Sequence, residues 1–189
     1  MNILEIKTKN FYYEHLLDSP NNKMLIKNFK VVYDNAKGLE AFLKVSSEEN
    51  EVYGENRTYL VKDKETKELV AYFSLRTGLF TLGEENNFIT IPSIELSNFA
   101  TNGCYRENHP ESKYLGAVVF NDFVLPIVRY IADFIAVKAL YIYALPEEGL
   151  IKHYETFGFN RLDVEQEKFV HSHIKPDYDE GCIFMYQLL

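Results

Sequence analysis

The chain has 189 residues, of which 47% are hydrophobic, and a formal net charge of −8 at pH 7. This apolar content excludes a disordered chain, and the length fits one domain, so we expect a single domain over residues 1–189. Nucleic acid is not expected as a partner, because phosphate binding needs clustered lysine and arginine, and the acidic balance instead favours solubility.

The two cysteines, Cys104 and Cys182, lie far apart in the sequence and form no Cys-x-x-Cys spacing. Neither a disulfide framework nor a metal site is therefore expected, which favours a reducing compartment and a cytoplasmic location. The first ten residues lack the apolar segment of a signal peptide. Residues 117–137 are apolar but include two aspartates, an asparagine and an arginine, so we expect no membrane span.

The first half of the chain is expected to be rich in strands. Residues 2–8 alternate loosely and predict a first strand, whereas residues 39–45 place apolar side chains at helical spacing. Residues 58–62 and 69–75 are β-rich and flank a charged, turn-prone segment, which is the pattern of a hairpin. Residues 88–101 predict a further strand.

The second half alternates between helical and strand patterns. Residues 117–137 are apolar on nearly every side and predict a buried helix that Pro126 should kink or divide. Residues 139–145 form a continuous apolar run, typical of a strand buried on both faces, and residues 182–188 predict the last strand. This alternation predicts an α/β or α+β fold with some parallel pairing.

Three segments together resemble the GNAT superfamily of N-acetyltransferases. They are the strand IPSIELSNFA at 91–100, the loop ESKYLGA at 111–117 that opens a helix, and HYETFGF at 153–159 after a buried strand. The resemblance spans roughly residue 57 to the C-terminus. It implies the GNAT fold, a twisted, mostly antiparallel mixed sheet flanked by helices in which strands four and five splay apart. It also implies acetyl-CoA as the cosubstrate, without a metal.

The loop at 111–117 corresponds to the pyrophosphate loop of the family, which delivers backbone N–H groups to a phosphate just before a helix. It departs from the family pattern at Glu111, where glutamine or arginine is usual, and at Tyr114, where glycine is usual. Without the other two segments, an ordinary loop before a core helix is the simpler interpretation. The resemblance implies acetyl-CoA contacts at Lys113, Tyr114, Leu115, Gly116 and Ala117.

Tyr154 is the first catalytic candidate. Leu150, Tyr154 and Phe157 recur at i, i+4 and i+7 and Gly158 follows, so a short helix with a glycine stop is predicted. The resemblance places the Tyr154 hydroxyl near the thioester sulfur, where it would protonate the departing CoA thiolate. The alternative is a core aromatic residue. The asparagine that usually precedes this tyrosine by seven residues is replaced by Glu147.

Glu95 is the second catalytic candidate. A carboxylate within a strand is unfavourable unless it is exposed or functional, and the resemblance implies a general base that takes a proton from the amine. The alternative is a solvated glutamate on an exposed strand face. The resemblance further implies that backbone groups of Phe99 and Thr101 bind the amides of pantetheine.

The remaining polar clusters have simpler interpretations. His171 and His173 lie two residues apart without a recognised ligand set, so a surface strand or loop is expected rather than a metal site. Residues 177–179 are expected to form a turn that could line the acceptor pocket.

The resemblance implies transfer of an acetyl group from acetyl-CoA to the amine of a small molecule or protein, and the acidic chain favours a cationic acceptor. A homodimer is one of the assemblies that the sequence allows. One alternative is a non-catalytic acyl-CoA sensor on the same scaffold, because fold does not fix function. A third interpretation, a toxin that acetylates charged tRNA, is disfavoured by the net charge of −8, since that substrate is a polyanion.

Overall fold

The computed structural model describes residues 4–6, 8–84, 87–173 and 181–189. The chain divides into two compact units, Met1–Arg76 with Ser97–Ile127 (unit 1) and Thr77–Leu96 with Val128–Leu189 (unit 2). Two long strands and one long helix run from one unit into the other.

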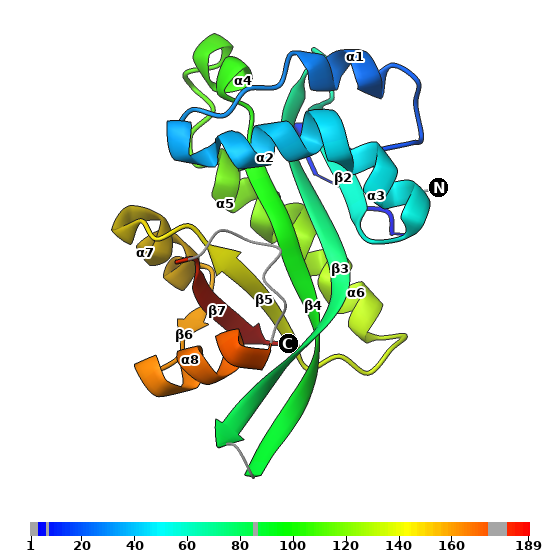
Figure 1. Ribbon diagram of the computed structural model, residues 1–189. Helices are drawn as coiled ribbons and strands as arrows, with labels where there is room; N and C mark the ends of the chain where they lie inside the picture. The colour runs from blue at the N-terminus through cyan, green and yellow to red at the C-terminus, as the bar shows by residue number, and fades with distance from the viewer. Residues whose placement is uncertain (1–3, 7, 85–86, 174–180) are drawn as a thin grey trace. The chain divides into compact units, whose positions relative to one another are not determined.

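Among the described residues, seven strands form one sheet in the order β1-β2-β3-β4-β5-β7-β6 (Figure 1). Pairing is antiparallel for β1–β2, β2–β3, β5–β7 and β6–β7, and parallel for β4–β5. The predicted mixed, mostly antiparallel sheet flanked by helices is thereby confirmed. The strands are β1 (Phe11–His15), β2 (Arg57–Asp63), β3 (Leu69–Glu84), β4 (Asn87–Thr101), β5 (Ala139–Ala144), β6 (Asn160–Arg161) and β7 (Ile183–Leu188).

The parallel pairing of β4 with β5 is short. It runs from Ser93 opposite Ala139 to Glu95 opposite Tyr141. Both strands continue past this point, but no further pair joins them. Strands four and five therefore separate after Glu95, as the fold prediction required.

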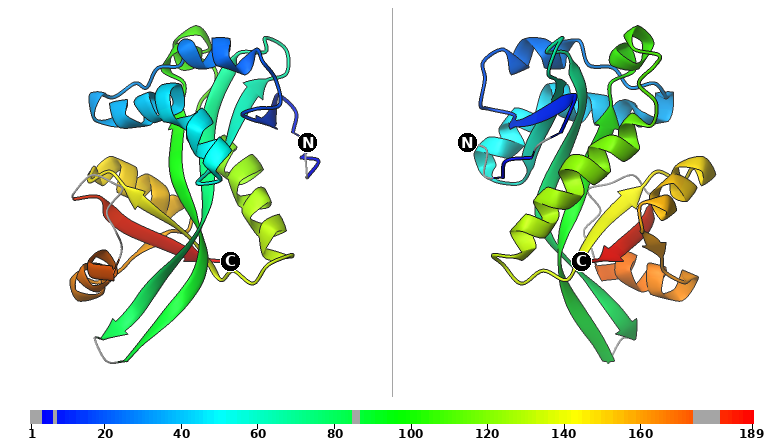
Figure 2. Two further views of the ribbon diagram at one scale, coloured as in Figure 1. Left: turned by 45° about the vertical axis from the view of Figure 1, so that its right-hand side comes forward. Right: turned by 180° about the vertical axis from the view of Figure 1, so that it is seen from behind.

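Unit 1 buries its core between the sheet and helices on both faces. Figure 2 shows α2 and α3 over one face of these strands and α5 over the other. Phe29, Leu43, Leu60 and Tyr72 are buried in one cluster, and the Tyr72 hydroxyl donates to the Leu39 carbonyl at 2.6 Å. The helical segments of this unit are α1 (Asn22–Lys27), η1 (Asp34–Ala36), α2 (Lys37–Ala41), η2 (Phe42–Ser46), α3 (Ser47–Tyr53), α4 (Gly103–Asn108), α5 (Leu115–Val119) and η3 (Phe120–Val124).

The predicted apolar helix runs without interruption from Leu115 to Ala132 through α5, η3 and α6 (Leu125–Ala132). Pro126 does not divide it, because the preceding η3 is a wide π-helical turn that re-registers the backbone where proline lacks an N–H. By length and composition alone this helix is apolar enough to cross a membrane, a property that the core helices of soluble proteins share. Its buried side chains Val119, Phe120, Phe123, Val124 and Val128 are those of a core helix.

Unit 2 contains β5, β6, β7, the distal halves of β3 and β4, and the helices α7 (Glu148–Thr156) and α8 (Val164–His173). Phe80, Tyr141 and Phe184 form an aromatic core with ring centroids 5.0–5.8 Å apart. The Gln166 side chain fixes α8 by accepting from the Gly83 N–H at 2.9 Å and donating to its carbonyl at 3.0 Å.

Two local predictions were wrong. The first strand is Phe11–His15 rather than 2–8, because Phe11 and Tyr13 are the residues that alternate into the core; residues 1–3 and 7 lie outside the described part of the chain. His171 and His173 belong to helix α8 rather than to a strand or loop. The turn expected at 177–179 also lies outside the described residues.

Candidate active-site residues

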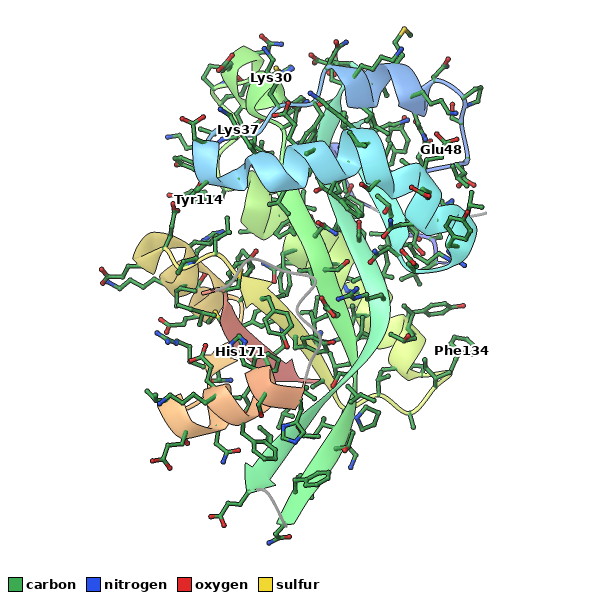
Figure 3. The ribbon with its side chains drawn as sticks, in the orientation of Figure 1. Lys30, Lys37, Glu48, Tyr114, Phe134 and His171 are labelled. Atoms are coloured by element: carbon green, nitrogen blue, oxygen red, sulfur yellow. The ribbon has the colours of Figure 1, made fainter. Side chains whose placement is uncertain are left out.

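The pyrophosphate-loop candidate lies in unit 1 and ends at Tyr114. Tyr114 adopts a left-handed conformation, with φ 57° and ψ 32°, immediately before α5. A bulky residue rarely adopts this conformation, which glycine reaches without strain, so the backbone at Tyr114 has a geometry that favours glycine. The side chain is 78% exposed and points outward in Figure 3, leaving the backbone to shape the loop.

The N–H groups of Leu115, Gly116 and Ala117 open the 18-residue helix Leu115–Ala132. Among the described residues these three groups have no hydrogen-bond partner, and Tyr114 supplies no side-chain cap. Leu115 is buried and anchors the turn. Unpaired N–H groups at the start of a long helix carry partial positive charge, which suits a pyrophosphate.

The unfavourable charge of Glu111 is offset within the loop. His109 Nδ1 lies 3.3 Å from Glu111 and its Nε2 lies 2.7 Å from Glu68. The hydrogen bond with Glu68 is the largest influence that raises the pKa of His109, and Glu111 adds to it. When it is protonated, the imidazole balances the charge of the Glu111 carboxylate. No pattern in the sequence indicated this contact of His109.

Phe99 and Thr101 lie near the end of β4 in unit 1, and both are half-buried. The strand stops because Asn102 leaves it and caps α4, its side chain accepting from the Cys104 N–H at 3.2 Å. The Asn102 N–H also donates to the Val70 carbonyl at 2.8 Å, which fixes this end of β4 to β3.

Tyr154 lies in unit 2 on α7, which ends before Gly158 at φ 89°, as predicted. Its ring meets those of Phe157 and Phe159 edge-on, at centroid distances of 6.0 and 5.6 Å. Burial raises the pKa of the Tyr154 hydroxyl, so the group keeps its proton at neutral pH. No described residue hydrogen-bonds to this hydroxyl. The group is thus a buried donor held by its ring.

Glu95 also lies in unit 2, and only 6% of it is exposed. The alternative of a solvated glutamate is therefore wrong. The Tyr141 hydroxyl donates a 2.8 Å hydrogen bond to Glu95 Oε2. Sequence reasoning missed Tyr141, since it lies inside a uniformly apolar run with no sign of its partner.

The structure thus distributes the predicted residues over both units. The loop residues, Phe99 and Thr101 belong to unit 1, whereas Glu95 and Tyr154 belong to unit 2 and make separate contacts there. Within the described ranges no three His, Cys, Asp or Glu side chains are grouped to hold a metal ion. His171 instead lies 3.8 Å from Glu167, one turn away on α8.

No family model matches the sequence. Several solved structures match this chain. A Tyr→Phe mutant of the toxin AtaT, bound to acetyl-CoA and the C-terminus of the antitoxin AtaR, matches with a TM-score of 0.67 at 15% identity over 95% of this chain and 94% of that chain. The chain has the GNAT fold.

Two further matches hold nucleic acid. AtaT complexed with acetyl-methionyl-tRNAfMet has a TM-score of 0.65 at 16% identity over 94% of each chain. A KacTA–DNA complex has a TM-score of 0.59 at 17% identity, covering 94% of this chain and 92% of that chain.

These comparisons contradict the prediction of a small-molecule or protein acceptor without a nucleic-acid partner. The prediction relied on the net charge of −8, which sums over the whole chain. Phosphate binding depends on local charge instead. Of the five lysines in residues 22–45, three pair with Glu48, Asp34 and Glu40, which leaves Lys27 and Lys30 without an ion pair among the described residues.

Proposed function

We propose that this protein is an N-acetyltransferase that moves the acetyl group of acetyl-CoA to the α-amine of an aminoacyl-tRNA. The observation that carries the proposal is the GNAT fold shared with structures that contain acetyl-CoA and an acetylated aminoacyl-tRNA. Both substrates are cytoplasmic molecules, so we place the activity in the cytoplasm.

Acetyl-CoA would bind mainly through backbone groups of unit 1. The unpaired N–H groups of residues 115–117 would hold the pyrophosphate, and Lys113, which is exposed, would add positive charge. Backbone groups of Phe99 and Thr101 would pair with the pantetheine amides. Because these contacts use the main chain, the departures at Glu111 and Tyr114 do not remove them.

The chemistry would use side chains of unit 2. The amine attacks the thioester carbon, the C–S bond breaks, and the CoA sulfur leaves as a thiolate. Tyr154, kept protonated by burial, would give that thiolate its proton, and Glu95 would accept the proton lost by the amine. An α-amine has a pKa of about 8, against about 10.4 for a lysine side chain, so about a tenth of it is neutral at pH 7, against less than about a thousandth of a lysine side chain. The demand on the base is therefore smaller than it would be for a lysine acceptor.

The tRNA phosphates would contact lysine and arginine side chains of unit 1. The Lys30 carbonyl accepts from the Gly103 N–H at 2.7 Å, which attaches the segment after α1 to the start of α4, the helix that carries Arg106 in its last turn. Figure 3 shows Lys30 beside α4. Within the described residues neither Lys30 nor Arg106 forms an ion pair, so both are available to phosphate.

The test is transfer of radiolabelled acetyl from acetyl-CoA to a pool of aminoacyl-tRNAs, with the same tRNAs after deacylation as the control. We expect label in the charged tRNA only, and its release with the amino acid on mild alkaline hydrolysis of the ester. Acetyl-CoA binding without transfer to any charged tRNA would instead favour the sensor.

A further inference from the structure

A tyrosine and a glutamate face each other across the only parallel pairing found among the described strands. Tyr141 on β5 is the register partner of Glu95 on β4. Because directly opposed residues of paired strands project from the same face, their side chains meet. The Tyr141 hydroxyl donates to Glu95 Oε2 at 2.8 Å, with both residues at least 94% buried.

The Tyr141 ring is fixed from several sides. It stacks on Phe184 at 5.5 Å and meets Phe80 edge-on at 5.8 Å. Tyr143, two residues along β5, contacts it edge-on at 5.9 Å. A ring held this way has one orientation for its hydroxyl, so the hydrogen-bond donor presented to Glu95 is rigid.

Gly78 on β3 supplies the space that the hydroxyl occupies. A Cβ atom at Gly78 would overlap Tyr141 Oη and would lie 2.7 Å from its Cε1 and 2.8 Å from its Cζ. The backbone of Gly78 has no positive φ that would require glycine. Glycine at position 78 is therefore needed for the space that a side chain would fill, and not for its backbone conformation. Glycine within a strand often marks such a close approach of another group.

We propose that Tyr141 is a positioning residue for Glu95, and that Gly78 keeps the room in which it does so. A glutamate has three rotatable bonds, and a general base must point at the proton it accepts. A donor on Oε2 fixes the orientation of the carboxyl group. This inference rests on the proposed function, because it gives Glu95 the role of the base.

The experiment is a double-mutant cycle of Tyr141→Phe and Glu95→Leu, read in two ways; leucine has no acceptor for the Tyr141 hydroxyl. The first readout is the free energy of unfolding, which reports the contact whether or not the protein is active. The second is kcat for acetyl transfer to charged tRNA. Phenylalanine keeps the ring and its packing, so the cycle isolates the hydroxyl.

We expect Tyr141→Phe to lower kcat about tenfold with little change in KM for acetyl-CoA, and to have no further effect in the Glu95→Leu background. Gly78→Ala should reproduce the loss, while Gly149→Ala, where an added Cβ meets nothing within 4 Å, should leave kcat unchanged. Coupling in both readouts supports the proposal.

Two results would overturn it, and they differ from each other. Coupling in stability with additive effects on kcat would make the bond purely structural, while the proposed function survives. Absence of transfer by the unmodified protein would remove the proposed function and with it the positioning role, whatever the stability cycle shows.

Discussion

The loop before α5 in unit 1 and the helix α7 in unit 2 offer a ligand different kinds of groups. The loop is exposed and presents main-chain N–H groups, with the Tyr114 side chain turned outward. Helix α7 presents one buried phenol fixed by aromatic neighbours. Binding through the backbone tolerates changes of side chain, whereas catalysis through one hydroxyl does not. Under the proposed function, this difference accounts for a degenerate loop motif beside an intact Tyr-x-x-x-Gly-Phe motif.

The largest effect is expected for Gly116→Asp in the first turn of α5. A carboxylate there would repel the pyrophosphate and occupy its space, so acetyl-CoA affinity should fall at least ~100-fold, or by about 2.7 kcal/mol. Calorimetry measures the affinity for acetyl-CoA. Gly38→Asp on α2, where an added Cβ has open space, is the matched control. Unchanged affinity in Gly116→Asp would place the phosphates elsewhere.

Tyr154→Phe should come next and should act on rate alone. Removing a general acid costs roughly 10²–10⁴-fold, and the CoA thiol is a tolerable leaving group, so we expect about 10²-fold in kcat. The affinity for acetyl-CoA should barely change, because the proton is needed only in the transition state. Steady-state assays compare this variant with the control Tyr33→Phe, a substitution of an exposed tyrosine. Full activity in Tyr154→Phe would make Tyr154 a core aromatic residue.

Charge reversal of Lys30 or Arg106 should weaken tRNA binding about tenfold and reduce the slope of log affinity against log salt by about 1. Acetyl-CoA affinity should stay the same. Filter binding over a salt series measures both quantities. Lys152→Glu on α7, whose lysine is already paired with Glu148 at 2.5 Å, is the control. An equal loss in the control would assign the effect to net charge.

The smallest effect concerns the His109 cluster and the pH dependence of stability. The pKa of His109 is raised in the folded protein. The stability that His109 contributes is therefore complete below its pKa in the unfolded chain, about 6.5, and is lost as the pH rises through its pKa in the folded protein. His109→Gln should therefore lower the free energy of unfolding more at pH 5.5 than at pH 8.5. The difference should stay below about 1 kcal/mol, because the pair is solvent-screened. Urea unfolding at both pH values tests this, and a larger loss at pH 8.5 would reverse the assignment.

Much of the fold could be predicted because its strands and helices carry periodic apolar patterns. The hairpin of β2 and β3, the strands β4, β5 and β7, and the helix that ends before Gly158 all formed where expected. Helix α8 was not predicted, since Val170 is its single buried residue and so few buried positions give no period. The first strand was displaced because residues 2–8 alternate as strands do.

The candidate site was predictable only where a local motif marks it. Gly116 and Tyr154 belong to such motifs, and Glu95 stood out as a charge within a strand. The contacts of Tyr141 with Glu95 and Gly78 depend on pairing between residues far apart in the sequence, which no local pattern reveals. The prediction of the partner was wrong because the net charge of the chain does not show where individual lysines lie or which of them are unpaired.

The division between a binding loop and a catalytic helix is tested most directly by measuring acetyl-CoA affinity and single-turnover transfer to charged tRNA for Gly116→Asp and Tyr154→Phe side by side. We predict that Gly116→Asp loses affinity, and that Tyr154→Phe binds normally yet transfers about 10²-fold more slowly at saturation. Loss of acetyl-CoA affinity in Tyr154→Phe, or normal affinity in Gly116→Asp, would contradict that division.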